Sequence, residues 1–333
     1  MLKQHSNYLG NSYLSSNKII KLLFFYLIII PALTFLVGVK DIRRWVDHQT
    51  YENYFYLATY NTYENIFKNG SDPIFVSLMK PFTSTVDGFS YFLILCAFIT
   101  LSIKLTALKK STDSFVILMI LYSAYFLCLH DYIQIRISLA MAFVILGMYS
   151  SLTKKSEIAY FIIAALIHLT SVFVIIPYVI YKYFGRRYSI ALILGAVFLP
   201  IILFSGIVHN ARLETYIALA KYKDAHFDAN PLASQPILQL IGLLYLYINK
   251  RLRNLVIHSY EYFISIIGVI CFYGMLKVPV LSFRLFEMTM FFYIILLSRV
   301  AKKSFFIMIL CLLFVLVGIK NMFYGDAALL ALH

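Results

Sequence analysis

Apolar stretches long enough to cross a bilayer recur along almost the whole chain, and they constrain the fold more than any other feature. A membrane helix needs about 20 apolar residues at 1.5 Å of rise per residue. Windows of about this length lie at residues 19–38, 88–108, 114–130, 132–152, 157–181, 188–208, 235–249, 256–276, 281–298 and 304–320. Only 13% of the residues are charged, against roughly 25% in soluble domains. We therefore predict an all-α polytopic membrane protein with about ten membrane segments in one domain, residues 1–333.

Basic residues gather in short clusters between these windows. The clusters hold 17 of the 29 Lys and Arg residues: Lys3, Lys18, Lys21, Lys104, Lys109, Lys110, Lys154, Lys155, Lys182, Arg186, Arg187, Lys250, Arg251, Arg253, Arg299, Lys302 and Lys303. Only Asp113, Glu157 and Glu261 accompany them, so the clusters carry 17 − 3 = +14, the whole formal net charge. Because short basic loops stay in the cytoplasm, this charge indicates topology and contact with anionic membrane lipids. It gives no reason to expect a nucleic-acid partner.

The window at 157–181 conflicts with a simple alternation of crossings. If Lys154 and Lys155 are cytoplasmic, one crossing would place the next basic cluster, at 182–187, outside. Twenty-five residues are too few for two full crossings but enough for two half-helices. We therefore predict a re-entrant pair with its turn near His168–Ser171, lining a cavity, since non-helical backbone at that depth needs protein or water around it. The alternative is one tilted helix with the 182–187 cluster outside.

Two extracytoplasmic loops, 39–87 and 209–234, are long for a compact membrane protein. Loops of more than about 15 residues are often lids or binding loops. The first is rich in aromatic residues, which suit either the membrane interface or stacking on sugar rings.

Arg136 is the strongest candidate for a functional residue. An arginine near the centre of a membrane helix costs roughly 2.5–3.5 kcal/mol, so it usually faces a partner or a wet cavity. Tyr132 stands four residues earlier and would share its helical face. We interpret Arg136 as a phosphate clamp; the alternative is a snorkelling arginine, or one paired with Asp131.

His168 and Arg284 are the other buried candidates. His168 stands among apolar residues and could act as a general base or bind a diphosphate, although such a histidine is commonly a satisfied structural group. Arg284 is predicted at the depth of Arg136, and two arginines at one depth suit a diphosphate; the alternative is an intrahelical pair with Glu287. The four cysteines lie singly, and nucleotide-binding and zinc-protease motifs are absent, so no metal or cofactor is expected.

Several of these residues together resemble one family. The matching segments are Asp47 with Tyr51, Asp72–Phe75, Ile133–Ala140, Lys154–Lys155 and Ala164–Ser171. In order and spacing they resemble the EpsG-like family, which groups with the Wzy-type O-antigen and exopolysaccharide polymerases. The family commonly has Arg-Gln where this chain has Arg136-Ile137, and Phe-His-x-Ser where it has Ile167-His168-Leu169-Thr170.

The resemblance implies a GT-C-like glycosyltransferase in the bacterial inner membrane with its active site facing the periplasm. It would transfer a glycan chain from undecaprenyl diphosphate to the next lipid-linked repeat unit, with a chain-length regulator as a possible partner. Its catalytic candidates are His168, Arg136 and Asp47, and its candidates for substrate contact are Arg284, Tyr132, Asp131 and Tyr51. The alternative is a multi-span transporter or flippase for a lipid-linked or anionic substrate, which would use the same buried arginines; inverted repeats would favour it, and none is evident.

Overall fold

A computed structural model describes residues 23–39, 47–69, 72–150, 153–185, 187–204 and 229–324. Every regular element within these ranges is a helix, as predicted. The elements are η1 Phe25–Ile29, α2 Ile30–Gly38, α3 His48–Tyr60, α4 Tyr63–Asn69, α5 Pro73–Met79, η2 Lys80–Phe82, α6 Gly88–Ser111, α7 Phe115–Phe126, η3 Leu127–Ile133, α8 Ile135–Ser150, α9 Lys154–Ile167, η4 Leu169–Ser171, α10 Val172–Phe184, α11 Arg187–Phe204, α13 Ser234–Ile248, α14 Lys250–Val256, α15 Tyr260–Gly274, α16 Pro279–Val300, η6 Ala301–Lys303 and α17 Phe305–Phe323.

Four helical stretches in the described ranges are long and apolar enough to cross a membrane, and they are 88–111, 115–133, 279–303 and 305–323. The pair α14 and α15, bent by 99°, would make a fifth if it is one span. Shorter apolar helices cover other predicted windows, because the chain breaks at Gln134 and His168 instead of running on as one helix. The protein is thus a helical membrane protein, and the full count of ten segments stays a prediction.

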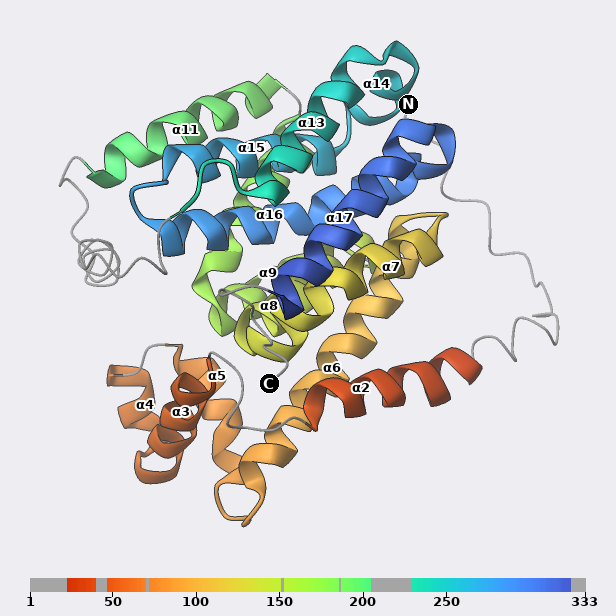
Figure 1. Cartoon of the computed structure of the whole chain (residues 1–333). Coiled ribbons are helices and arrows are strands. Elements are labelled where there is room, and N and C mark those ends of the chain that lie inside the picture. Colours follow the sequence, from red (N-terminus) through yellow and green to blue (C-terminus); the bar gives the residue numbers. More distant parts are fainter. Residues whose placement is uncertain are drawn as a thin grey trace.

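Helix α16 forms the centre of the main bundle and packs mainly against α15 (Figure 1). Its residues Met290, Phe291 and Phe292 are fully buried. Close approach of the two helices depends on Gly268, where an added Cβ would lie 1.8 Å from Thr289 Oγ1. Small residues commonly allow such contact between membrane helices. On the outside of the bundle large apolar side chains such as Leu312 and Leu316 are exposed, which suits contact with lipid.

The segment that connects α9 to α10 reverses the chain. Lys182 Nζ lies 2.6 Å from Glu157 Oε2, and the hydroxyl of Tyr183 donates to the same oxygen at 3.2 Å. One continuous helix over these residues would separate the two groups by roughly 35 Å. The chain therefore reverses as predicted and does not run on as one helix, with the turn at His168–Ser171, where the short η4 separates the two arms. That the pair is re-entrant in the membrane stays a prediction.

Helices α3, α4 and α5 form a helical cap that covers one end of the bundle, beside the start of α6 (Figure 1). The predicted loop at 39–87 is thus largely helical where it is described. A second apolar core joins the cap to α6, α8 and α9, with Tyr51, Phe75, Phe92, Leu139 and Ile167 buried together. Most of the other predicted loop, 209–234, lies outside the described residues, which omit 205–228.

Candidate functional site

Two breaks in the helices bring Arg136 and His168 together. Helix η3 ends at Ile133, and Gln134 bonds back to Leu129 (N to O, 2.8 Å) before α8 begins, so Arg136 lies in the first turn of α8. His168 has extended backbone, with φ −153°, directly after α9. Both α9 and η4 pack against α8. Two residues that are 32 positions apart therefore meet at the junction between the helical cap and the bundle.

Asp72 of the cap lies between these two residues. One carboxylate oxygen, Oδ2, forms an ion pair with Arg136 Nη1, and the other, Oδ1, lies 3.8 Å from His168 Nδ1. All three side chains are largely buried, with exposed fractions of 13% for Arg136, 4% for Asp72 and 5% for His168. Asp72 has φ +60°, the one positive φ among the described non-glycine residues. Left-handed backbone costs roughly 1–2 kcal/mol for most residues, and here it directs the carboxylate to the site just before α5 begins at Pro73.

Tyr51 and Tyr54 of α3 fix the guanidinium of Arg136. The backbone N–H of Arg136 donates to Tyr51 Oη at 3.2 Å, and Nη1 donates to Tyr54 Oη at 2.8 Å. The guanidinium carbon also lies 5.5 Å and 4.7 Å from the centres of the Tyr51 and Tyr54 rings, within the range of cation–π attraction. Burial raises the pKa of Tyr51 to about 12, so its hydroxyl is neutral at physiological pH.

Several buried polar atoms at this junction have no hydrogen-bond partner among the described residues. They are both ring nitrogens of His168, Nε of Arg136, Oε1 of Gln134, Oγ1 of Thr170 and Oγ of Ser171. Buried polar groups are nearly always bonded to protein, water or another molecule. The set combines a guanidinium donor, an imidazole and two hydroxyls, which together suit a phosphate or the hydroxyl of a sugar.

A second carboxylate, Glu287 of α16, borders the same region. Gln134 Nε2 donates to Glu287 Oε2 at 3.2 Å, and the hydroxyl of Tyr125 reaches Oε1 at 3.5 Å. Arg284 lies within electrostatic range of both His168 and Glu287. Asp47, at the start of α3, lies within electrostatic range of Tyr51 and Glu287. The structure thus gathers the predicted residues Arg136, His168, Arg284, Asp47 and Tyr51 around one junction.

Asp131 does not lie open to this junction. It is buried in the bundle, where Lys104 Nζ lies 2.7 Å from Oδ1 and where Tyr122 and Ser138 also donate to its carboxylate. The side chains of Lys104 and Asp131 are both 0% exposed. The suggested pairing of Asp131 with Arg136 is therefore wrong, whereas its contact with substrate stays a prediction that this burial does not favour. We assigned Lys104 to a basic cluster between the apolar windows, but it is buried in the bundle instead. It lies there because the buried carboxylate of Asp131 needs a cation beside it.

Tyr132 is also placed differently from the prediction. It belongs to η3, which ends before the break at Gln134, whereas Arg136 belongs to α8. The two residues therefore do not share the face of one continuous helix. Tyr132 instead packs beside the core that joins the cap to the bundle.

Sequence reasoning did not select four residues of the site as candidates: Asp72, Tyr54, Gln134 and Glu287, the last of which was named only as an alternative partner of Arg284. Asp72 was noted only as part of the segment Asp72–Phe75, and Tyr54 only as one of many aromatic residues. An Asp-Pro pair before a short apolar helix was the one signal that marked Asp72 as a special position.

Comparison with known proteins gives one match. The model of the EpsG family matches residues 23–330, nearly the whole chain. Among curated proteins and solved structures, none matches the chain.

Proposed function

The chain belongs to the EpsG family, and from that premise we propose that it is a polysaccharide polymerase of the bacterial inner membrane. It transfers a growing glycan from undecaprenyl diphosphate to the next lipid-linked repeat unit at the periplasmic face. The observation that carries this proposal is the buried group of Arg136, Asp72 and His168, with polar atoms that lack partners among the described residues.

Arg136 is well placed to bind the diphosphate of the donor lipid. Its Nη1 is held by Asp72 and Tyr54, while its Nε has no partner among the described residues. A guanidinium fixed on one side can present the other to a phosphate without losing further side-chain freedom. Arg284 supplies a second positive charge close to His168. As the leaving diphosphate gains negative charge, the two cations stabilise the transition state.

His168 is the general base in this proposal. Asp72 Oδ1 faces its Nδ1 at 3.8 Å, and such distances commonly shorten when substrate binds. When the proton of the neutral His168 ring is on Nδ1 and points to Asp72, the other nitrogen, Nε2, is free to accept a proton. Nε2 takes the proton of the acceptor hydroxyl while that oxygen forms a bond to the anomeric carbon of the donor. The bond from that carbon to the diphosphate oxygen breaks, and undecaprenyl diphosphate leaves. Asp47 is the reserve candidate for acceptor contact or for the base.

Exposed tyrosines on the cap suit a glycan acceptor. Tyr56 and Tyr60 are 62% and 71% exposed, and their ring centres lie 4.4 Å apart. Rings presented in this way can stack against the apolar faces of sugars. They lie on α3, the helix that also carries Tyr51 and Tyr54 into the site.

Replacement of Arg136 by alanine in a strain that lacks the native copy tests the function. We expect long polysaccharide to disappear while the variant protein accumulates in the membrane as the unaltered protein does. Arg251→Ala is the matched control, because Arg251 is exposed at the other end of the bundle. Lipid-linked single repeats that reach the outer surface without polymerising support a polymerase. Absence of these repeats from the surface would support a transporter instead. Full-length polysaccharide in the Arg136 variant would contradict the assignment of Arg136 to the polymerase site.

A further inference from the structure

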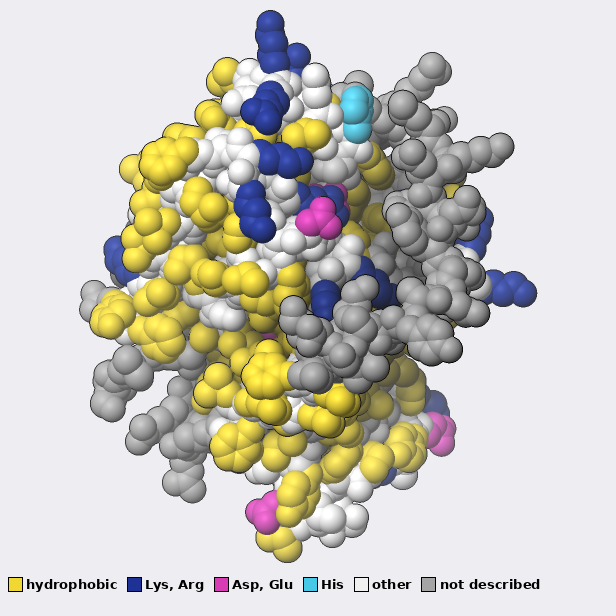
Figure 2. Space-filling model, turned by 90° about the vertical axis from the view of Figure 1, so that its right-hand side faces the viewer, with side chains coloured by type: hydrophobic (Ala, Val, Ile, Leu, Met, Phe, Trp, Pro, Cys, Tyr) yellow, Lys and Arg dark blue, Asp and Glu magenta, His cyan; other side chains and the backbone are white. Residues whose placement is uncertain are grey.

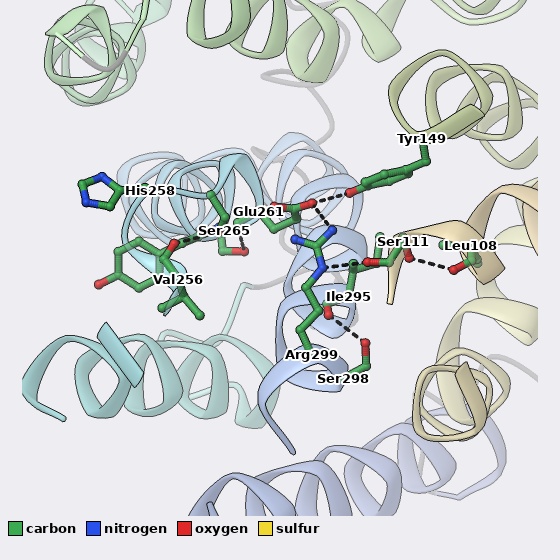
Figure 3. Close-up of polar contacts among 12 residues, drawn as sticks. Leu108, Ser111, Tyr149, Val256, His258, Glu261, Ser265, Ile295, Ser298 and Arg299 are labelled. Carbon is green, nitrogen blue, oxygen red and sulfur yellow. Dashed lines mark hydrogen bonds and ion pairs between the residues drawn. The ribbon is translucent and has the colours of Figure 1, made fainter. Parts of the chain in front are cut away.

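A cavity of about 280 Å³ opens at the end of the bundle opposite to the candidate site. Its lining residues come from three separate parts of the chain: Lys110, Ser111, Thr112, Asp113, Leu255, Val256, Ser259, Leu296, Arg299, Val300 and Lys303. Helix α8 relates the two ends, since Arg136 lies in its first turn and Tyr149 near its end, roughly 20 Å away along the axis. Tyr149 bonds to Glu261, which pairs with Arg299 of the cavity (Figure 3).

Arg299 is held rigidly at the wall of this cavity. Its Nε donates to the carbonyl of Ser111 at 2.7 Å, and its Nη2 lies 2.8 Å from Glu261 Oε1. The hydroxyl of Tyr149 donates to the same carboxylate oxygen at 2.7 Å. These contacts use one edge of the guanidinium and leave Nη1 without a partner in the described part of the chain. A fixed, partly unused guanidinium is a typical anchor for a phosphate.

Two further cations line the cavity and have no ion pair within the described ranges. Lys110 and Lys303 are both exposed. With Arg299 they make three positive charges; Asp113 of the lining and Glu261, the ion-pair partner of Arg299, offset two of them, which leaves 3 − 2 = +1. Figure 2 shows the side of the molecule that lies on the right in Figure 1. Lys and Arg side chains gather on its upper part, around one acidic side chain and above a broad apolar surface.

Of the three cations, Arg299 bonds to a carbonyl at the end of a helix, that of Ser111 in α6. Hydroxyl groups already bond to other carbonyls in the last turns of α6, α14 and α16: Ser111 to Leu108 at 2.8 Å, Ser259 to Val256 at 2.7 Å and Ser298 to Ile295 at 2.7 Å (Figure 3). Exposed carbonyls at a helix C-terminus would otherwise attract the lysines. Lys110 and Lys303, which form no ion pair within the described ranges, can therefore interact with an external anion.

The lining also contains four aliphatic residues. They are Leu255, Val256, Leu296 and Val300, of which Leu255 is 52% exposed and the other three are buried. A lining that combines exposed lysines with the exposed side chain of Leu255 suits the phosphate of an anionic phospholipid and the first part of its acyl chain. Basic pockets between membrane helices on the cytoplasmic side are typical sites for such headgroups, and the positive-inside rule predicts that this end faces the cytoplasm.

We propose that this cavity binds a phosphate-bearing anion at the cytoplasmic face, with an anionic phospholipid as the source that fits its lining of cations and aliphatic groups. The full-length protein, purified in detergent, would be titrated with phosphatidylglycerol or cardiolipin and the bound lipid measured by native mass spectrometry. The double variant Lys110→Gln/Lys303→Gln should bind these lipids at least about tenfold more weakly, given the usual contribution of each surface cation to lipid binding.

The control is the double variant Lys155→Gln/Lys250→Gln, which removes two exposed lysines outside the cavity. It should bind anionic lipid like the unaltered protein, and phosphatidylcholine should bind equally weakly to all three proteins. Displacement of the lipid by inorganic diphosphate at low concentration would identify a soluble phosphate as the source. Equal loss of lipid in both double variants, or no loss in either, would overturn the proposal, since the cavity would then have no special affinity. Arg136 is unchanged in these proteins, so polymerase activity can be measured separately.

Discussion

Arg136 and Asp72 form a buried ion pair across the junction between the helical cap and the bundle, although they stand 64 positions apart in the sequence. Removal of one partner from a buried pair typically costs about 3–5 kcal/mol, because the other charge is left uncompensated. The pair therefore connects the position of the cap to the geometry of the site. Removal of the charge at Arg136 or at Asp72 should therefore change both the position of the cap and the geometry of the site.

Asp72→Asn is expected to abolish polymerisation and to lower stability. The amide keeps the shape of the side chain and tolerates left-handed backbone, but it no longer neutralises Arg136 or orients His168. We expect loss of long polysaccharide, and a lower melting temperature of the detergent-solubilised protein. Asp87→Asn, in the exposed turn before α6, is the control and should change neither. Wild-type polymer in the Asp72 variant would show that the ion pair does not serve catalysis.

His168→Gln is expected to lower the turnover number more than it changes KM for the acceptor. Glutamine retains hydrogen-bonding capacity but cannot act as a base, and loss of a general base typically reduces the rate about 100- to 10,000-fold. The measurement is the initial rate with purified lipid-linked repeat units at saturating and limiting concentrations. His258→Gln serves as the control, because His258 is exposed at the other end of the bundle. An unchanged turnover number would transfer the role of base to another residue, with Asp47 the next to test.

The sequence was sufficient to predict the helical membrane class. It also singled out Arg136, His168 and Arg284 as candidates, which the structure places near one another, because a charge or imidazole inside an apolar window is conspicuous. The chain reversal at His168–Ser171 could be predicted from charge on both flanks. Asp72 could not, since its role depends on how the cap docks on α8, which no local pattern encodes. Tyr132 was misplaced for a related reason: an apolar window does not show where a helix changes from α to π winding and then breaks.

The buried ion pair between Lys104 and Asp131 can be tested by mutation. Sequence reasoning had assigned both residues to other roles. Lys104→Met should destabilise the protein by about 3–5 kcal/mol, because the carboxylate of Asp131 loses its cation. The double variant Lys104→Met/Asp131→Leu should recover much of that loss, since it removes both charges. Chemical or thermal unfolding in detergent measures the difference. A double variant less stable than both single variants would contradict a simple pairing of the two charges.

The two arms of the α9–α10 hairpin should be accessible from the same side of the membrane. Lys155 and Phe184 are both exposed, and the ion pair between Glu157 and Lys182 holds their neighbourhoods together. In a protein whose native cysteines are replaced by alanine, Lys155→Cys and Phe184→Cys should both react with an impermeant maleimide in inside-out vesicles and not in intact spheroplasts.

Tyr56→Cys, on the exposed face of the cap, is the control for the opposite side and should react only in spheroplasts. Labelling of position 184 from the outside would mean that the arms lie on opposite sides of the bilayer. The ion pair could not then exist in the membrane, because a full hydrocarbon layer of about 30 Å would separate its two groups. The same result would also change the side of the membrane on which we place the cavity near Arg299. The predicted side of every later helix depends on this hairpin.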